Sequence, residues 1–283
     1  KRCGSREEER LDRFVYTREN LRKLQLTELE MLKELDRICR ENKIRYIIDA
    51  GTLLGAVRHG GFIPWDDDID VRMLRRDYDR FCEACKTELG EKYFLQTYRT
   101  DPGYRWGYAR ILKKGTVYKR KGQHRMTAKN GIFIDIFPND NLPDTLFANK
   151  LCTGLSWICR KILYSEVGIY NKNRFSSWLG FHILNLLPKE WGHRGMEYLS
   201  RKYRNIKTAR VRCFGWGDKV ETAGFLRKWN EETRDILFEG ITVSAPEDLE
   251  GFLTCSFGKD YMTLPPEEKR KPAHIADYIH FGE

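Results

Sequence analysis

The chain of 283 residues lacks any apolar run long enough to cross a membrane. A spanning helix needs about 18 consecutive apolar residues, and every apolar stretch here is shorter or interrupted. Asn-x-Ser/Thr is also absent, so nothing predicts N-glycosylation in a secretory pathway. We therefore expect a cytoplasmic protein, free or peripheral at the inner membrane surface. Because the sequence begins with Lys1 rather than Met, an additional N-terminal signal or anchor stays open.

The sequence also lacks the cysteine spacing of a disulfide framework, because its eight cysteines are scattered. We expect reduced thiols, the usual state in the cytoplasm. Cys82 and Cys85 form a Cys-x-x-Cys pair within a helical pattern, and no second pair at metal spacing accompanies them. We interpret them as buried thiols, with a zinc or redox site as the alternative.

The charge balance is basic. There are 51 Lys and Arg against 41 Asp and Glu, for a net charge of +10. Such a balance indicates an anionic partner or serves solubility alone. One basic stretch fits a lid over a diphosphate, a face for an anionic acceptor, or a solvated loop. Only Tyr118 interleaves with it, which argues against a nucleic-acid surface. Its members are Lys113, Lys114, Lys119, Arg120, Lys121, His124, Arg125 and Lys129.

The most informative stretch runs from residue 49 to 73 and ends in an acidic run, Asp66-Asp67-Asp68-Ile69-Asp70-Val71. In a strand, side chains alternate between faces, so Asp66, Asp68 and Asp70 would share one face. Three like charges repel there unless a cation lies among them. Oxygen-only ligands favour a hard ion such as Mg²⁺, or Mn²⁺. The alternative is a solvated acidic loop, which has little use for the interleaved apolar residues.

A second carboxylate is predicted in the segment NGIFIDIFPND, residues 130–140. Its continuous apolar run is typical of a fully buried strand. Asp135 stands alone within this run, and an isolated buried carboxylate is costly unless it is paired or binds a metal. The alternative is a buried Asp that caps a turn.

Residues upstream of the acidic run are candidates for binding phosphate. Gly51 and Thr52 read as a tight turn that opens a short helix, whose free N–H groups suit a phosphate. Arg58 would bind a phosphate through two hydrogen bonds. His59 is a general base or a surface group at the helix end. Arg110 lies inside an apolar strand pattern, either in the metal and phosphate site or on an exposed edge strand.

The remaining chain divides by pattern. Residues 6–43 read as a scaffold helix, with Thr27 and Glu30 as a capping box at an N-terminus. Strands are expected at 45–49, 93–98, 107–112 and 211–216, and helices at 75–89, at 231–240 and from Pro246. We predict scaffold helices over 1–43, a catalytic core over 44–143, a helical insertion over 144–205, and a completing C-terminal part over 206–283.

The last informative segment is SFGKDYMTLPPEEKRKPAH, residues 256–274. Adjacent prolines fix an extended path, and Lys269, Arg270 and His274 follow them. These three are candidate phosphate ligands; a basic surface tail is the alternative.

Three segments together resemble the LicD family: GTLLGAVRHGGFIPWDDDIDV, NGIFIDIFPND and the segment just described. The family includes bacterial phosphocholine transferases and is related to fukutin-type phosphoribitol transferases. Phe257 and the extra Lys259 are mild departures from its C-terminal motif. The resemblance implies an α+β fold, with a nucleotidyltransferase-like mixed β-sheet core flanked by helices and a helical insertion.

The resemblance also implies the chemistry. Asp66, Asp68, Asp70 and Asp135 would hold one or two divalent ions, and Asp68, Asp70 and Asp135 would be catalytic. A CDP-alcohol of the CDP-choline type would donate its phospho-alcohol group to a hydroxyl of a cell-surface glycan or of a lipid-linked glycan precursor, releasing CMP. Two other functions stay open: transfer of NMP from an NTP, and non-catalytic glycan binding on a decayed transferase fold.

Overall fold

The computed structural model describes residues 14–120, 123, 126–171, 175–274 and 276–282. Helices and a mixed sheet alternate along the chain, which confirms the α+β class. The helices are α1 (Arg18–Glu41), α2 (Ala50–His59), α3 (Arg75–Glu88), α4 (Leu146–Asn171), α5 (Phe175–Asn185), α6 (Lys189–Lys202), α7 (Lys219–Ala223), α8 (Lys228–Glu231) and α9 (Leu249–Phe257). The strands are β1 (Ile47–Ile48), β2 (Asp70–Leu74), β3 (Tyr93–Gln96), β4 (Ala109–Lys113), β5 (Val117–Arg120), β6 (Phe133–Leu142), β7 (Arg210–Arg212), β8 (Phe225–Leu226), β9 (Thr233–Phe238), β10 (Ile241–Pro246) and β11 (Ala276–His280).

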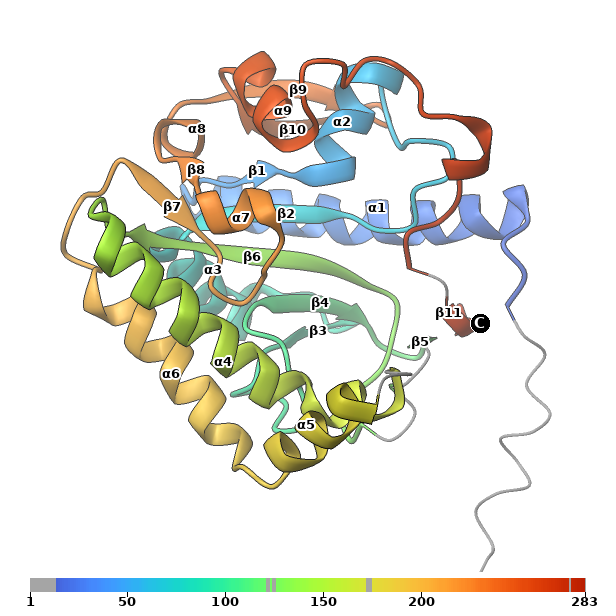
Figure 1. Cartoon of the computed structure of the whole chain (residues 1–283). Helices are drawn as coiled ribbons and strands as arrows, with labels where there is room; N and C mark the ends of the chain where they lie inside the picture. Colours follow the sequence, from blue (N-terminus) through green and yellow to red (C-terminus); the bar gives the residue numbers. More distant parts are fainter. Residues whose placement is uncertain (1–13, 121–122, 124–125, 172–174, 275, 283) are drawn as a thin grey trace, which may run out of the picture.

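The main sheet has the order β1-β2-β6-β4-β3, and β7 pairs with the far end of β6 and with β8. Strands β2 and β6 are parallel, while the other neighbours are antiparallel. Strand β6 is the longest and runs through the centre (Figure 1). Its apolar residues are almost all buried, as the continuous apolar run predicts.

The longer helices form two groups, and the short helices α2 and α9 lie beside the β9–β10 hairpin (Figure 1). Helices α1 and α3 pack together, and the large core cluster lines α1 with Leu24, Leu32 and Leu35, each fully buried. Helices α4, α5 and α6 form a separate group, in which α4 and α6 pack on a smaller cluster around Phe214 and α5 packs on α4. These three helices lie within the range predicted for the insertion, whose domain boundaries stay a prediction.

The predicted N-terminal helix is wrong at its start. Helix α1 begins at Arg18, because Thr17 is the N-cap and its hydroxyl accepts a hydrogen bond from the Asn20 N–H. The predicted capping box at Thr27 is also wrong. Thr27 lies inside the helix and its hydroxyl donates to the Lys23 carbonyl. The predicted residues 6–13 lie outside the described part of the chain.

The helix predicted at 231–240 is wrong, because most of this segment is strand β9 of a β9–β10 hairpin. Phe238 pairs with Ile241, so Glu239 and Gly240 form a two-residue turn with φ of 51° and 77°. Both residues adopt the left-handed backbone conformation that a type I′ hairpin turn requires. Pro246 ends β10 rather than starting a helix, and α9 is capped by the Asp248 carboxylate.

Candidate functional site

A row of three charged side chains crosses the centre of the sheet. Asp70 on β2 pairs in register with Asp135 on β6, which pairs with Arg110 on β4. Paired positions on neighbouring strands place side chains on one face. Arg110 donates from Nε to Asp135 Oδ1 at 2.6 Å and from Nη2 to Oδ2 at 3.3 Å. The structure therefore brings together carboxylates from two distant segments, although their roles stay predictions.

Arg110 is buried inside an aromatic shell. Its guanidinium carbon lies 3.8 Å from the ring centre of Phe133, 5.1 Å from Trp106 and 5.7 Å from Tyr104. Burial alone would lower the pKa of Arg110, but Asp135 outweighs this effect and raises it. The alternative of an exposed edge strand is wrong, because β4 lies between β6 and β3 and Arg110 is 5% exposed.

The acidic run is mostly a loop rather than the predicted strand. Strand β2 begins only at Asp70, and Asp66 to Asp68 precede it. The reason lies in the neighbouring strands: β1 pairs with Val71 and Arg72, and the pairing with β6 starts at Asp70, so within the described residues no strand pairs with Asp66 to Asp68. The loop is not solvated, because Asp67 is 1% exposed and Asp68 is 8% exposed.

Asp67 binds the backbone of the C-terminal segment at residues 273–274 and so holds that segment against the acidic loop. Its carboxylate accepts hydrogen bonds from the N–H groups of Ala273 at 3.1 Å and His274 at 3.1 Å. The hydroxyls of Tyr16 and Tyr118 each donate to the His274 carbonyl at 2.9 Å. These four bonds fix the backbone of residue 274, and they place its imidazole against the acidic loop.

His274 contacts a carboxylate of the acidic loop, and its predicted role as a phosphate ligand stays a prediction. Its Nδ1 is 2.8 Å from Asp68 Oδ2 and 3.7 Å from Asp67 Oδ1. Among the described residues, Asp67, Asp68 and His274 form a group whose ligand atoms lie within 4.8 Å of one another, close enough for one cation. Asp67 was not among the metal ligands predicted from the sequence.

The pKa values indicate an excess of negative charge. Burial and the neighbouring carboxylates of Asp68 and Asp135 raise the pKa of Asp70 well above its usual value. Burial, followed by Asp68, raises the pKa of Asp66 in the same way. Burial would also raise the pKa of Asp68, but its contact with His274 more than offsets this and leaves it lowered. A bound cation would relieve this repulsion.

Two further residues belong to the site: Glu28, which the sequence analysis missed, and Arg120, which it named only as a member of the basic stretch. Glu28, on α1, is 2% exposed, and its Oε2 has no hydrogen-bond partner. Burial and then Asp68 raise its pKa well above the usual value. Arg120, on β5, is near Asp135 and Asp68, and its buried Nε and Nη2 also lack partners. The signal for Glu28 was its place in the apolar row of α1, four residues after Leu24. Lys121, His124 and Arg125 of the basic stretch lie outside the described residues.

Gly51 and Thr52 lie in the first turn of α2, beside the acidic loop. The Thr52 hydroxyl accepts from the Asp70 N–H at 3.0 Å, so it orders the start of β2. A Cβ on Gly51 would collide with the Asp66 carboxylate, whose buried Oδ2 has no partner. The N-cap, Asp49, makes no side-chain cap bond. The N–H groups of this helix end are therefore not satisfied by the usual side-chain cap.

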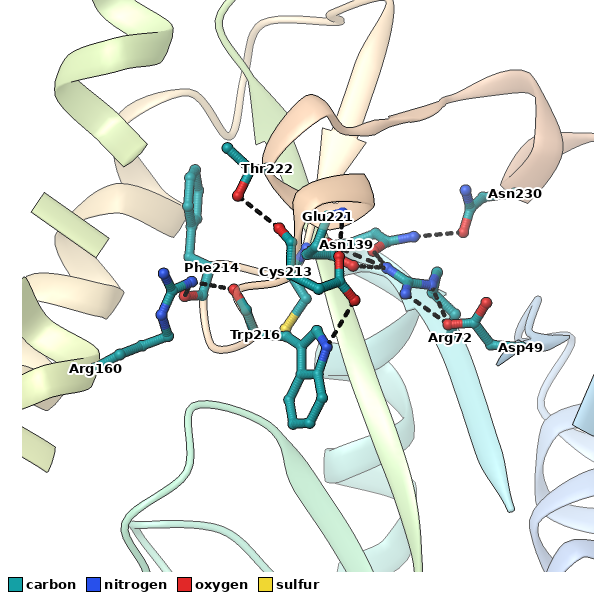
Figure 2. A network of polar contacts seen from close by, with 11 residues as sticks. Asp49, Arg72, Asn139, Arg160, Cys213, Phe214, Trp216, Glu221, Thr222 and Asn230 are labelled. Carbon is teal, nitrogen blue, oxygen red and sulfur yellow. Dashed lines mark hydrogen bonds and ion pairs between the residues drawn. The ribbon is translucent and has the colours of Figure 1, made fainter. Parts of the chain in front are cut away.

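Instead of capping α2, the Asp49 carboxylate binds Arg72 in a buried polar network (Figure 2). Arg72 Nε donates to Asp49 at 2.7 Å, and Nη1 donates to Asn139 at 2.8 Å and to Glu221 at 2.9 Å. Burial would lower the pKa of Arg72, but its two carboxylates raise it. This network ties β2, β6 and α7 together and fixes the strands that carry Asp70 and Asp135.

Of the other predicted phosphate ligands, His59 at the end of α2 and Arg270 lie beside the ring of Trp65. Arg58 donates from Nε to His59 Nε2 at 3.0 Å and from Nη1 to the Tyr261 carbonyl at 2.9 Å. Arg270 lies 5.8 Å from the ring centre of Trp65. Burial lowers the pKa of Arg58, and burial and then Arg58 lower that of His59. Lys269 is exposed, and in the described part of the chain it has no ion pair with the acidic residues.

In the cysteine pair on α3, Cys85 is buried and Cys82 is half-buried. Cys82 and Cys85 are free, and burial raises the pKa of Cys82 to about 12. Neither belongs to a group of metal-ligating side chains within the described ranges.

As for membranes, no helix of the described chain is both long and apolar enough to span one.

Comparison with known proteins identifies relatives. A family model described as "LicD/FKTN/FKRP, nucleotidyltransferase domain" matches residues 43–158. The lipopolysaccharide cholinephosphotransferase LicD of Haemophilus influenzae is 32% identical over 277 residues, which cover 91% of this chain and 97% of that protein. The human ribitol 5-phosphate transferase FKRP is 50% identical over 43 residues, 15% of this chain and 8% of that protein. An uncharacterized protein of Rickettsia typhi is 44% identical over 52 residues, 18% of this chain and 17% of that protein.

The match to the Haemophilus protein spans nearly the whole length of both chains. It includes the acidic loop, the buried strand β6 and the helices α4 to α6. The chain belongs to the LicD family.

Proposed function

We propose that this protein transfers a phospho-alcohol group of the phosphocholine type from a CDP-alcohol to a hydroxyl of a cell-surface glycan or its lipid-linked precursor, with release of CMP. The coarse part of this proposal, a transferase, is supported by both named relatives, a cholinephosphotransferase and a ribitol 5-phosphate transferase. The donor and the acceptor are the finer part. They are inferred from the family resemblance and from the charges of the site.

The observation that carries the proposal is the row Arg110, Asp135 and Asp70 beside the acidic loop. We assign Asp66, Asp68, Asp70 and Asp135 as ligands of Mg²⁺ or Mn²⁺, because Asp66 Oδ2 is buried without a partner, and burial, followed by the neighbouring carboxylates, raises the pKa of Asp70. Among the described residues, the ligand atoms that lie within 4.8 Å of one another are those of Asp67, Asp68 and His274, so the four assigned side chains would have to converge further on an ion. When bound, a divalent cation would neutralise the diphosphate and orient it for in-line attack.

The protein's own groups would then hold the reactants. Arg110 and Arg120 supply guanidinium donors for phosphate oxygens, and the uncapped start of α2 supplies backbone N–H groups. The acceptor hydroxyl oxygen attacks the phosphorus of the phospho-alcohol group, and the bond from that phosphorus to the CMP oxygen breaks. We assign Asp135 the role of accepting the hydroxyl proton once Arg110 turns to the phosphate.

A donor panel tests this function. The purified protein is incubated with CDP-choline, CDP-glycerol, CDP-ribitol or CTP, with a glycan acceptor and Mg²⁺, and CMP and pyrophosphate are measured. We expect CMP from a CDP-alcohol, no pyrophosphate from CTP, and no product after chelation. Pyrophosphate released from CTP would favour the alternative function, transfer of a nucleotide from an NTP. The description of the matching family model, which includes the words "nucleotidyltransferase domain", is the reason to keep this alternative. Saturable glycan binding without turnover of any donor would favour a binding protein.

A further inference from the structure

The exposed apolar side chains are concentrated in one part of the molecule. Fourteen of the twenty-one large apolar residues that are exposed in the described chain lie between residues 146 and 206. This segment contains α4, α5 and α6, which lie together on one side of the sheet (Figure 1). Scattered exposed apolar residues are normal, but such a concentration marks an interaction surface.

Helix α5 presents its apolar stripe outward. The stripe comprises Phe175, Trp178, Leu179, Ile183 and, just after the helix, Leu186, with exposed fractions of 73%, 39%, 44%, 58% and 84%. Their spacing of three and four residues is the spacing that normally faces a core. The only described residue of α5 that is buried is Phe181, which packs against Gly168 and Tyr164 of α4. The stripe is therefore on the outer side of α5.

Helix α4 continues this surface. Trp157 is 53% exposed and Ile158 is 47% exposed. The Lys161 ammonium lies 5.6 Å from the ring centre of Trp157 and 5.7 Å from that of Phe181 on α5. The two helices thus offer tryptophan, aliphatic and lysine side chains at neighbouring places. Tryptophan and lysine are typical of helices that lie at a membrane interface.

The net charge of residues 146–207 indicates the kind of partner that this surface binds. Residues 146–207 contain eleven Lys and Arg against three Glu, so this fifth of the sequence carries +8 of the total charge of +10. A second copy of the chain would present a surface with the same strong charge, which opposes self-association. An anionic lipid surface is complementary to both the apolar stripe and the cations.

We propose that α4 and α5 dock this protein on an anionic lipid bilayer, with the α5 stripe inserted at the headgroup level and the Lys and Arg side chains bound to lipid phosphates. The docked helices are joined to the loop between β3 and β4, because Arg105 is ion-paired with Glu166 of α4 at 3.1 Å. That loop also carries Trp106, which packs on Arg110. Docking would hold this wall of the candidate site near a lipid-linked acceptor.

Vesicle flotation tests the docking without any turnover, so its outcome is independent of the proposed reaction. The full chain is mixed with phosphatidylcholine vesicles, with or without phosphatidylglycerol. The test variant is Trp178→Ser with Ile183→Ser. The matched control is Leu237→Ser with Leu264→Ser, whose residues are 66% and 46% exposed but lie outside α4 to α6. Thermal denaturation checks that both variants fold.

We expect the protein to float with the anionic vesicles and more weakly with pure phosphatidylcholine. The test variant should bind about tenfold or more weakly, because two apolar side chains no longer insert, whereas the control should bind as the wild type does. Absence of flotation with anionic vesicles, or an equal loss in the control, overturns the proposal. A wild-type dimer that the test variant converts to a monomer, without vesicle binding, would assign the surface to a second copy instead.

Discussion

The sheet centre and the helices α4 to α6 depart from the ordinary distribution of side chains in opposite ways. The centre buries charges: Glu28, Arg72 and Asp135 are each at most 5% exposed. The helical group exposes large apolar residues such as Phe147 and Phe175. Both arrangements cost free energy in an isolated molecule. The comparison teaches that each region has a surface or a site that the chain itself leaves unmatched, and this is the basis of our two proposals: a cation and a diphosphate at the sheet centre, and a lipid surface at the helices.

Asp70→Asn should give the largest effect, because it removes a central charge of the site but keeps its shape. We expect CMP release to fall about a thousandfold, as for loss of one strong transition-state interaction. The free energy of unfolding in chelator should not decrease, since Asp70 is repelled by its neighbours. Mg²⁺ should raise the melting temperature of the wild type more than that of the variant.

The matched control for that measurement is Asp235→Asn, an exposed carboxylate paired with Arg40 on the surface. It should keep full activity. Unchanged turnover in Asp70→Asn would contradict the assignment of the acidic residues.

Arg72→Met should produce the largest loss of stability. It leaves Asp49 and Glu221 buried without their cation, which costs about 3–5 kcal/mol. Arg40→Met removes an exposed arginine that also contacts two carboxylates, and should cost less than about 1 kcal/mol. Urea denaturation of both variants measures the difference. Similar losses for the two would mean that the buried network does not hold the strands together.

His193, between α6 and the sheet, should make stability depend on pH. Burial, then Arg105, lowers its pKa from 6.5 to about 4, and its ring stacks on Tyr98 at 4.4 Å. The unfolded chain therefore binds the proton first, so the stabilisation present above about pH 6.5 is lost as pH falls towards 4. Urea unfolding should show a loss on the order of 1–2 kcal/mol across this range.

The control for the pH effect is a comparison of His193→Gln with His182→Gln on the exposed face of α5. Tyr98, Arg105, Glu190 and Glu197 surround His193 and are unchanged in both variants. His193→Gln should reduce the pH dependence of the free energy of unfolding, whereas His182→Gln should leave that dependence unchanged. An identical profile in both would remove His193 as the cause.

The smallest effect is expected from Trp178→Ser and Ile183→Ser measured without lipid. Because these residues are exposed, each should change the free energy of unfolding by less than about 0.5 kcal/mol. Leu163→Ala, on α4 but 2% exposed, should cost about 2–5 kcal/mol. A large loss of stability from the serine variants would show that the α5 stripe is part of the core, and the comparison between the two regions would no longer hold.

Local pattern was sufficient for much of the site. The apolar run around Asp135 predicted strand β6, because burial on both faces imposes a continuous apolar sequence. The alternation in the acidic run predicted a strand from Asp66, whereas β2 begins only at Asp70. The helix of Arg75–Glu88 followed from its spacing in the same way. The partnership of Arg110 with Asp135 was left open, because no local pattern states which strand lies beside another.

The sequence by itself determined the buried strands, the acid residues on them, the uneven distribution of charge and the family. Only the tertiary structure decided that Glu239 adopts a left-handed turn, where Arg22 and the Phe62 N–H bind its carboxylate. It alone placed Glu28 and Arg120 beside the acidic loop and His274 against Asp68, more than 200 residues away in sequence. The physical reason is that propensity and periodicity act over a few residues, whereas the energy of a buried charge depends on whatever the fold brings to within a few ångströms.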